Sequence, residues 1–295
     1  MRKLLFPALV ALFSLVWSSA FIVAKVALVD FDPATILTLR FALSAALLLA
    51  LPGCSLARLR ETLPIGATLG LLNNAAYLGL TFTALQYVRP VVVVVIVSCA
   101  PFMTTLLAAI AGVERANGLK LLGVAVGFVG VLIIAGWNLG GDPIGVLLAG
   151  AGAAAFSFAT VVFRAKAAAL PVRELNFWQS LAGALALAPF AILFGRGLGA
   201  ASLPGALAIL YLAMVVTIGG MGLWMILIRA SGAGSASAYH LMNPFFGVVL
   251  SAAILGAPMR GADFLGAAVI AIGLFVTMTA SKQGQPVREA ASTAR

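Results

Sequence analysis

The sequence is poor in charge, since only 9% of its 295 residues are Asp, Glu, Lys or Arg while 63% are hydrophobic. Soluble domains carry roughly 25% charged and about 45–50% apolar residues. Too few charges are present to cover a water-exposed surface, which excludes an ordinary soluble enzyme and a disordered chain. The hydrophobic excess predicts an integral membrane protein that lies in a lipid bilayer.

Cysteine and histidine are almost missing, with two residues and one residue respectively. Cys54 and Cys99 are far apart and His240 stands alone, so we expect no disulfide framework, no metal site and no cofactor. The net charge of +10 comes from cations that lie singly or in pairs beside apolar runs, not in a basic stripe. We therefore expect no nucleic-acid partner.

Acidic residues are absent from the middle of the apolar runs. All eight lie near the ends: Asp30, Asp32, Glu61, Glu114, Asp142, Glu174, Asp263 and Glu289. Intramembrane carboxylates are the usual proton relays, sodium ligands and counter-ions of cationic drugs. Their absence disfavours a sodium-coupled carrier and an exporter of cationic drugs, and it excludes an aspartyl protease. No Gly-x-Ser-x-Gly turn occurs either, so we expect no enzyme.

Ten apolar runs are long enough to cross a bilayer, which takes about 20 residues. We expect spans at residues 4–28, 33–51, 64–84, 90–111, 118–136, 143–163, 175–194, 204–228, 235–255 and 262–280. The loops are too short for a soluble domain. The first run follows basic residues as in a signal peptide, but it is too long for a signal core, so we expect an uncleaved first helix.

Positive charges predict the orientation, because Lys and Arg gather in cytoplasmic loops. With the N-terminus inside, thirteen cations fall inside and four outside, while Arg40 lies within the second span. We therefore expect a multi-pass protein of the bacterial inner membrane with both termini in the cytoplasm. The polar tail, residues 282–295, is expected to be disordered there.

The two halves of the sequence resemble each other. A shift of 143 positions superimposes one proline and three glycines: Pro101 on Pro244, Gly118 on Gly261, Gly123 on Gly266 and Gly130 on Gly273. Each half, residues 1–137 and 138–281, then holds five spans. Because five is odd, the second repeat is inverted. Inverted repeats build alternating-access transporters whose substrate site lies near the bilayer midplane; chance matching of common glycines is the weaker explanation.

Several short motifs follow one another along the first half: Trp17-Ser18-Ser19, Ala24-Lys25, Leu39-Arg40-Phe41, Ala84-Leu85, Pro101 and Gly112-Val113-Glu114-Arg115. With the ten spans and the inverted repeat, they resemble the EamA-type branch of the drug/metabolite transporter superfamily over residues 4–280. The resemblance implies export of small metabolites, and it is strongest to YddG-type exporters of aromatic and other neutral amino acids. The second half departs from the first, with Ala257-Pro258 in place of Glu114-Arg115, which favours a structural role for Glu114.

Polar and aromatic residues deep in the spans are candidates for substrate binding. Trp17 and Ser18 lie midway along the first span, and Asn73, Asn74 and Tyr77 lie deep in the third. Amide and phenol groups at this depth need partners that lipid does not offer. They either hold helices together or bind the amino and carboxyl groups of a substrate, whose side chain Trp17 and Tyr77 flank.

The ninth span carries a polar cluster, Tyr239, His240 and Asn243, where the first half has only apolar residues. Helical spacing places Asn243 on one face with Tyr239 or His240. His240 is either a structural residue bonded to a neighbouring carbonyl or a substrate contact, and it is the natural candidate for proton coupling. We expect efflux driven by the substrate gradient, with proton coupling through His240 as the alternative.

Two further pairs stand out. Pro101 and Pro244 interrupt the fourth and ninth spans at matching positions and are candidate hinges, or static bends. Lys25 and Arg40 lie in the outer half, within reach of the surface. They either form a positive vestibule that attracts a carboxylate, or Lys25 pairs with an acid of the adjoining loop, Asp30 or Asp32.

We therefore predict an all-α membrane transporter that binds a small-molecule substrate, exports neutral or aromatic amino acids or related metabolites, and functions as a monomer. A lipid scramblase or a structural membrane component is the alternative class. That alternative predicts that Asn73, Tyr77 and Asn243 line a lipid-facing groove instead of an interior site. Three other tryptophans fall near span ends, where an interfacial aromatic belt is expected: Trp137, Trp178 and Trp224.

Overall fold

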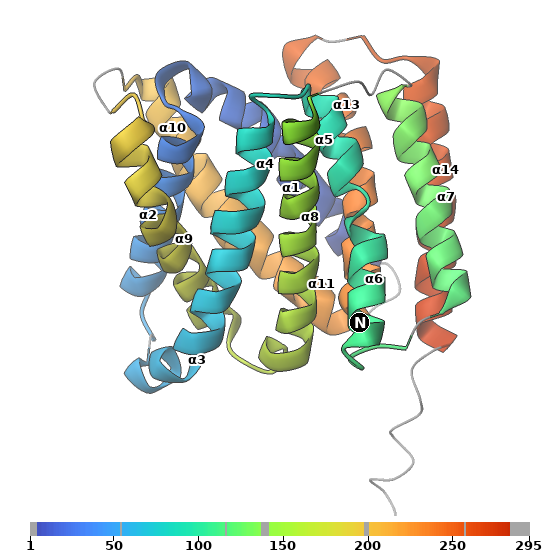
Figure 1. The fold of residues 1–295 in the computed structure, drawn as a ribbon, viewed down its shortest axis with the longest axis horizontal. Helices are drawn as coiled ribbons and strands as arrows, with labels where there is room; N and C mark the ends of the chain where they lie inside the picture. The colour runs from blue at the N-terminus through green and yellow to red at the C-terminus, as the bar shows by residue number, and fades with distance from the viewer. Residues whose placement is uncertain are drawn as a thin grey trace, which may run out of the picture.

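The computed structural model describes residues 5–53, 55–115, 117–136, 142–197, 201–256 and 258–283, and within these ranges every regular element is a helix (Figure 1). The first half contains α1 (Leu5–Asp30), α2 (Pro33–Ala50), α3 (Leu56–Leu69), the π-helix η1 (Gly70–Tyr77), α4 (Leu78–Ala84), α5 (Pro90–Val97), α6 (Ala100–Ile110) and α7 (Gly118–Ala135). The second half contains α8 (Pro143–Val162), η2 (Phe163–Ala167), α9 (Val172–Phe194), α10 (Leu203–Tyr211), the π-helix η3 (Leu212–Gly220), α11 (Met221–Ser231), α12 (Ala233–Ala238), η4 (Tyr239–Met242), α13 (Asn243–Leu255) and α14 (Gly261–Gln283).

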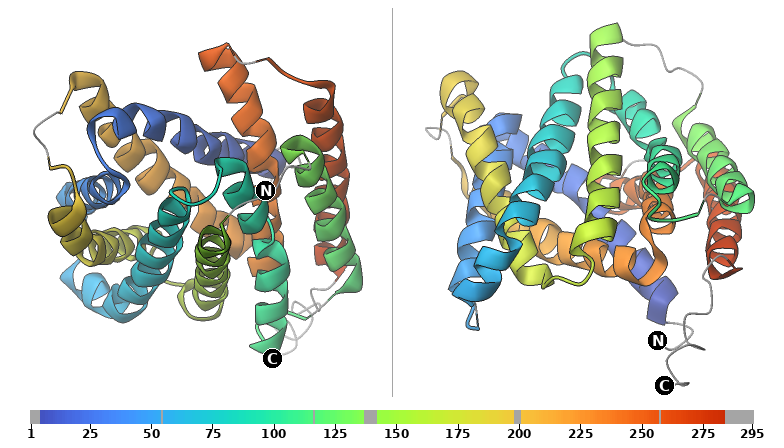
Figure 2. Two further views of the ribbon diagram at one scale, coloured as in Figure 1. Left: turned by 45° about the horizontal axis from the view of Figure 1, so that its top comes forward. Right: turned by 60° about the horizontal axis from the view of Figure 1, so that its bottom comes forward.

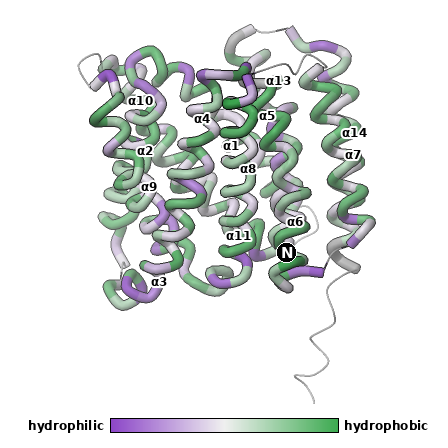
Figure 3. The backbone as a smooth tube through the Cα atoms, in the orientation of Figure 1, coloured by the Kyte–Doolittle hydropathy of each residue, from purple (hydrophilic) through white to green (hydrophobic). Residues whose placement is uncertain are grey.

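Many of these elements join end to end into longer helices. Among the described residues, nine helical segments are long and apolar enough to cross a membrane: Leu5–Asp30, Pro33–Ala50, Val92–Ile110, Gly118–Ala135, Pro143–Ala167, Val172–Phe194, Leu203–Ser231, Ala233–Ile254 and Gly261–Ala280. One more continuous helix, formed by α3, η1 and α4, packs against α8 and α9. It is less apolar because it carries Asn73 and Asn74. The most hydrophilic segments lie at the two ends of the bundle (Figure 3).

Polar residues in the loops begin several helices. Asp32 precedes α2, where its carboxylate accepts hydrogen bonds from the backbone N–H and the hydroxyl of Thr35 at 3.0 and 2.6 Å. Burial alone would raise the pKa of Asp32, but these bonds and one from the N–H of Arg196 more than offset it, so the pKa lies below its ordinary value. The carboxylate therefore ties the loop between α1 and α2 to the end of α9.

Both predicted proline breaks are present. α5 ends and α6 begins just before Pro101, and α12 gives way to η4 and α13 just before Pro244. Proline lacks the backbone N–H and its ring clashes with the carbonyl four residues earlier, which explains both interruptions. The use of the two breaks as hinges stays a prediction.

Among the described residues, the most extensive helix contact joins α7 and α14, which lie side by side (Figures 1 and 2). A Cβ atom on Gly123 would lie 2.7 Å from the carbonyl oxygen of Gly273, and one on Gly266 would lie 2.6 Å from that of Gly130. The shift of 143 positions turns the first contact into the second. The glycines of the sequence repeat therefore form a symmetric, antiparallel backbone contact between the last helices of the two halves.

Adding a single methyl group to this contact is expected to lower the stability of the protein. We expect Gly273→Ala to destabilise the protein by about 1–3 kcal/mol, because its Cβ would lie 2.5 Å from the carbonyl oxygen of Gly123, and backbone cannot move aside like a side chain. Gly150→Ala, at a helical position with open space, is the matched control. Thermal unfolding in detergent measures both, and equal melting temperatures of the two variants would contradict this packing.

Candidate functional site

His240 lies at the centre of four aromatic rings from both halves of the chain. Their centroids lie 4.6–5.1 Å from the imidazole centroid, and they belong to Phe13 and Trp17 of α1, Phe156 of α8 and Trp224 of α11. None of these five side chains is more than 8% exposed. We term the four rings the aromatic cage.

The cage has internal symmetry. Phe13 and Phe156 are 143 positions apart and stack on the indole of Trp224, at 5.3 and 5.6 Å between centroids. Two residues that the repeat makes equivalent thus contact one tryptophan. The cage therefore lies where the two halves of the molecule meet.

Polar groups border the cage on the side of η4. The Nδ1 atom of His240 is 2.9 Å from the side-chain nitrogen of Asn243, which confirms that the two share a helix face. The hydroxyl of Ser18 donates to the backbone carbonyl of Asn243 at 3.0 Å. The Nε2 atom of His240 is buried and has no hydrogen-bond partner among the described residues. Because the amide occupies Nδ1, Nε2 is the imidazole atom available to a ligand.

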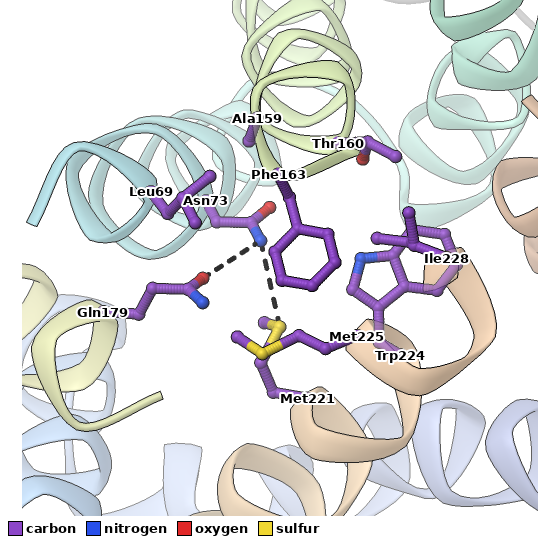
Figure 4. Close-up of a pocket in the computed structure, with 10 residues that line it drawn as sticks. All are labelled: Leu69, Asn73, Ala159, Thr160, Phe163, Gln179, Met221, Trp224, Met225 and Ile228. Atoms are coloured by element: carbon purple, nitrogen blue, oxygen red, sulfur yellow. Dashed lines mark hydrogen bonds between the residues drawn. The ribbon is translucent and has the colours of Figure 1, made fainter. Parts of the chain in front are cut away.

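A small cavity, which we term the amide pocket, adjoins the cage. The side-chain nitrogen of Asn73 lies 3.4 Å from Gln179 Oε1 and 3.8 Å from Met221 Sδ (Figure 4). Trp224 belongs to both the pocket and the cage. The pocket measures about 10 Å³, room for roughly one water. Its lining consists of Leu69, Asn73, Ala159, Thr160, Phe163, Gln179, Met221, Trp224, Met225 and Ile228.

The π-helix η1 positions the amides. Asn74 donates to the backbone carbonyl of Gln179 at 2.9 Å, while its Cβ lies so close to α9 that a Cβ on Gly183 would be 2.5 Å away. The absent side chain of Gly183 thus permits the close approach of η1 and α9. The Oδ1 atoms of Asn73 and Asn74 are buried and have no partner among the described residues. Segments of π-helix are frequent at functional sites, and this one carries three predicted site residues.

Tyr77, at the end of η1, connects the cage to a buried cation. Its ring centroid is 4.9 Å from that of Phe156, one of the four rings of the cage. The guanidinium of Arg40 lies within electrostatic range of Tyr77 and donates through Nε to the hydroxyl of Thr217 at 3.1 Å. That hydroxyl in turn donates to a carbonyl five residues earlier in the π-helix η3.

The structure brings most of the predicted site residues together. Trp17 is one ring of the cage, His240 lies at its centre, and Ser18, Tyr77 and Asn243 border it. The two asparagines of η1 line or border the amide pocket beside it. Whether these residues bind substrate stays a prediction.

Tyr239 is the exception among the predicted polar residues. Its ring meets the edge of Phe6 at 6.1 Å between centroids, and its backbone carbonyl accepts a hydrogen bond from the hydroxyl of Ser14 at 3.4 Å. Tyr239 is therefore engaged outside the cage, although its neighbour His240 lies at the centre of it.

The two cations of the expected vestibule have different environments. Lys25 is exposed, whereas Arg40 is buried within the bundle and does not reach the surface as expected. Among the described residues neither Asp30 nor Asp32 forms an ion pair with Lys25; Asp30 accepts bonds from the amide and hydroxyl of Ser202. Lys25 and Arg40 therefore do not form the shared outer vestibule that we expected: Lys25 lies at the surface and Arg40 in the interior.

The sequence analysis misplaced one site residue and missed three, Phe13, Phe156 and Gln179. Trp224 was expected in the interfacial belt, but it is 1% exposed and packs between two phenylalanines, so that prediction is wrong. Gln179 follows Asn176 by three residues at the start of an apolar run, and this pair of amides is a local signal for a polar site. Phe13 and Phe156 have no local signal, because the chain contains 18 phenylalanines. Trp137, also expected in the belt, lies outside the described residues.

A cluster of charges joins the two halves at one end of the bundle. Glu114 pairs with Lys120 at 2.9 Å and with Arg164 at 3.8 Å. Its carboxylate also accepts hydrogen bonds from the amides of Ala233 and Gly234 at the start of α12. Negative charge at a helix N-terminus is stabilising, so Glu114 links the loop after α6 to α12, in line with the structural role that we expected.

The chain matches the model of the EamA-like transporter family twice, over residues 5–136 and 143–279. It belongs to the EamA-like transporter family. YedA of Escherichia coli strain K12, named an uncharacterized inner membrane transporter, is 30% identical over 96% of this chain and 93% of its own length. A protein of the same strain named a probable amino-acid metabolite efflux pump is 29% identical over 89% of this chain and 91% of its own.

The fold has a counterpart among solved structures. One crystal structure, 21% identical in sequence, has a TM-score of 0.81 over 95% of this chain and 98% of its own. The predicted family is confirmed, and the chain is a multi-pass transporter of the bacterial inner membrane.

The charge cluster predicts a stability effect. We expect Glu114→Gln to destabilise the folded protein by about 1–3 kcal/mol, because Lys120 is buried and loses its charged partner. Glu61→Gln removes the same charge from an exposed site and is the control. Thermal unfolding in detergent reports the difference; if the two variants melt together, the cluster does not stabilise the protein.

Proposed function

We propose that this transporter exports small metabolites, with neutral and aromatic amino acids as the first candidates, by alternating access. The observation that carries the proposal is the buried pairing of the aromatic cage with the amide pocket at the meeting point of both halves. Polar groups at membrane depth are functional by default, and substrate sites of repeat-built transporters lie between the repeats.

The chemistry of the site suits an amino acid with an apolar side chain. Aromatic rings favour an apolar or aromatic group, and unpartnered amide oxygens of Asn73 and Asn74 accept hydrogen bonds from an ammonium group. The relative named a probable amino-acid metabolite efflux pump supports this substrate class. Related small metabolites with the same groups fit equally.

We propose ten spans, with residues 56–84 as the third, and two inverted repeats with both termini in the cytoplasm. Figure 1 supports the even number, because the start of α1 and the end of α14 lie on the same side of the bundle. The symmetric antiparallel contact of α7 with α14 supports the inversion. The same contact supports a division into two repeats, residues 1–137 and 138–281, because it joins the last helix of each. Most of the tail, 284–295, lies outside the described residues.

The closed interior favours a mechanism with large movements. A pocket of about 10 Å³ cannot admit an amino acid, so the helices around it must separate during transport. In the proposed orientation, the Glu114 cluster lies at the cytoplasmic end, where it holds α12 of the second half to the first. Opening that end requires these bonds to break, and the breaks before Pro101 and Pro244 are the candidate hinges.

We propose that the substrate gradient drives export. No carboxylate of the described residues contacts the cage, so a proton relay from an acid to His240 has no donor there. Coupling to protons through His240 alone is the alternative. A lipid scramblase or structural component is the alternative from another class.

Transport assays test the substrate and its driving force. We expect proteoliposomes of the purified chain, preloaded with labelled L-phenylalanine or L-leucine, to release them with or without a pH gradient. Trp17→Ala is expected to slow release about tenfold or more, equivalent to about 1.4 kcal/mol, because it removes a wall of the cage. Phe190→Ala, at an exposed aromatic residue, is the control.

Two results would count against this proposal. Absence of amino-acid release under both conditions would reject the substrate class. Release that needs an imposed proton gradient and is abolished by His240→Ala would replace gradient-driven export by proton coupling.

Cysteine labelling separates a transport path from a lipid-facing groove. In a background with Cys54→Ser and Cys99→Ser, we expect Asn73→Cys to react with a membrane-impermeant maleimide and Leu185→Cys, which is 65% exposed on the outside of the bundle, to resist it. Adding Glu114→Gln is expected to speed the reaction from the cytoplasmic side, because the cluster closes that end. If Asn73→Cys reacts no faster than Leu185→Cys, the interior path is rejected.

A further inference from the structure

Arg40 is a permanently charged side chain in the interior of the bundle. It lies seven residues after the start of α2, which is about 10 Å along the helix axis, and only 7% of its surface is exposed. A cation at this depth is costly unless another group compensates its charge.

The protein itself supplies little compensation. None of the ion pairs of the described residues involves Arg40. Its Nε–H donates to Thr217 and its guanidinium lies 4.9 Å from the ring centroid of Phe41. The two terminal amino groups, which carry four of the five N–H donors, have no hydrogen-bond partner among the described residues.

Arg173 offers a comparison, because its donors are satisfied by backbone carbonyls. Arg173 donates to the carbonyl oxygens of Leu48, Leu51 and Pro52, at the end of α2 and just beyond it. This arginine uses both Nε and its terminal groups to hold backbone together. Arg40 uses Nε alone, so its geometry is not that of a purely structural arginine.

The repeat gives a second, independent indication. The shift of 143 positions places Arg40 on Gly183 and Thr217 on Asn74. In one half, Asn74 packs directly on the glycine; in the other, Thr217 accepts a bond from the arginine. The contact of α2 with η3 thus contains a guanidinium, whereas the equivalent contact of α9 with η1 has a glycine, without a side chain, at that position. Helix packing alone does not require the cation.

The neighbours of Arg40 lead to the cage. Tyr77 lies within electrostatic range of the guanidinium, and its ring centroid is 4.9 Å from that of Phe156, a cage residue. The fork of a guanidinium matches the two oxygens of a carboxylate. A small acid with its carboxylate at Arg40 would direct its apolar part toward the rings of Trp17 and Phe156.

We propose that Arg40 binds the carboxylate of the transported molecule, so that the carrier requires a small monocarboxylate, whether or not that molecule has an amino group. This inference rests on the proposed transport through the interior and narrows its substrate class. The unpartnered amide oxygens add affinity for an ammonium group, and Arg40 supplies the obligatory interaction.

The test compares four probes that share a phenyl group and differ in charge: L-phenylalanine, 3-phenylpropanoate, L-phenylalaninamide and 2-phenylethylamine. Release of each from proteoliposomes is measured for the wild-type protein and for Arg40→Gln and Arg40→Lys. Arg60→Gln, at an exposed arginine, is the control for removal of a positive charge.

We expect the two carboxylates to be released about tenfold or more faster than the amide and the amine. Arg40→Gln should abolish this preference, and Arg40→Lys should restore part of it. A structural defect slows all four probes alike, so the ratio of carboxylate to amide release separates binding from folding, and a melting curve of each variant accompanies it.

The outcomes also separate this inference from the proposed function. Release of 3-phenylpropanoate but not L-phenylalanine, lost in Arg40→Gln, would support Arg40 and reject amino-acid export. Equal release of L-phenylalanine and its amide, unchanged in Arg40→Gln, would overturn the role of Arg40 and leave amino-acid export standing. No release of any probe above that of protein-free liposomes would overturn both.

Discussion

Lipid offers no hydrogen-bond partners, so each polar group of this bundle depends on another part of the chain. Hydroxyls meet this constraint locally: Ser44, Thr81 and Thr160 each donate to the carbonyl four residues earlier. Such bonds need no substrate. The informative groups are those that the chain leaves unsatisfied, and in the site these are amide oxygens, one imidazole nitrogen and the end of one guanidinium.

Two π-helices hold part of this arrangement: η1 carries Asn73 and Asn74, and η3 carries Thr217, the partner of Arg40. The shift of 143 positions carries η1 into η3, so each half has a π-segment at the same point of its third long helix. A wider turn interrupts the usual bonding pattern, as Thr217 illustrates by donating to a carbonyl five residues earlier. The duplicated architecture therefore preserves an irregularity of the backbone, while the side chains that it presents have diverged from Asn74 to Thr217.

Much of the fold could be predicted because hydrophobic length and proline act locally. The positions of the long helices follow from apolar runs, and the breaks at Pro101 and Pro244 follow from the missing backbone N–H. The burial of individual side chains was harder to predict, because a residue near the end of a span does not always lie at the membrane surface. Trp224 lies near the end of its expected span, yet the oblique course of the helices places it in the interior.

The site was predictable where polarity contrasts with its surroundings. Asn73, Asn74 and His240 stand out in apolar sequence, whereas Phe156 acquires its role only by facing residues from other helices. The environment of Arg40 depends on η3, which is more than 170 residues away along the chain. A local sequence pattern therefore cannot predict that Arg40 pairs with Thr217.

The glycine contact of α7 with α14 has a mechanical consequence. The two helices touch through backbone atoms, so no change of side-chain rotamer can loosen the contact gradually. The contact is also symmetric, because each half contributes the same two glycine positions to it. In the alternating access proposed above, such a contact would act as a pivot, about which the halves turn without separating. Displacement during a rotation grows with distance from the pivot, and α2 and α9 lie at the opposite edge of the bundle (Figure 1). The helix that carries the buried arginine, α2, would therefore have a long lever arm in such a rotation.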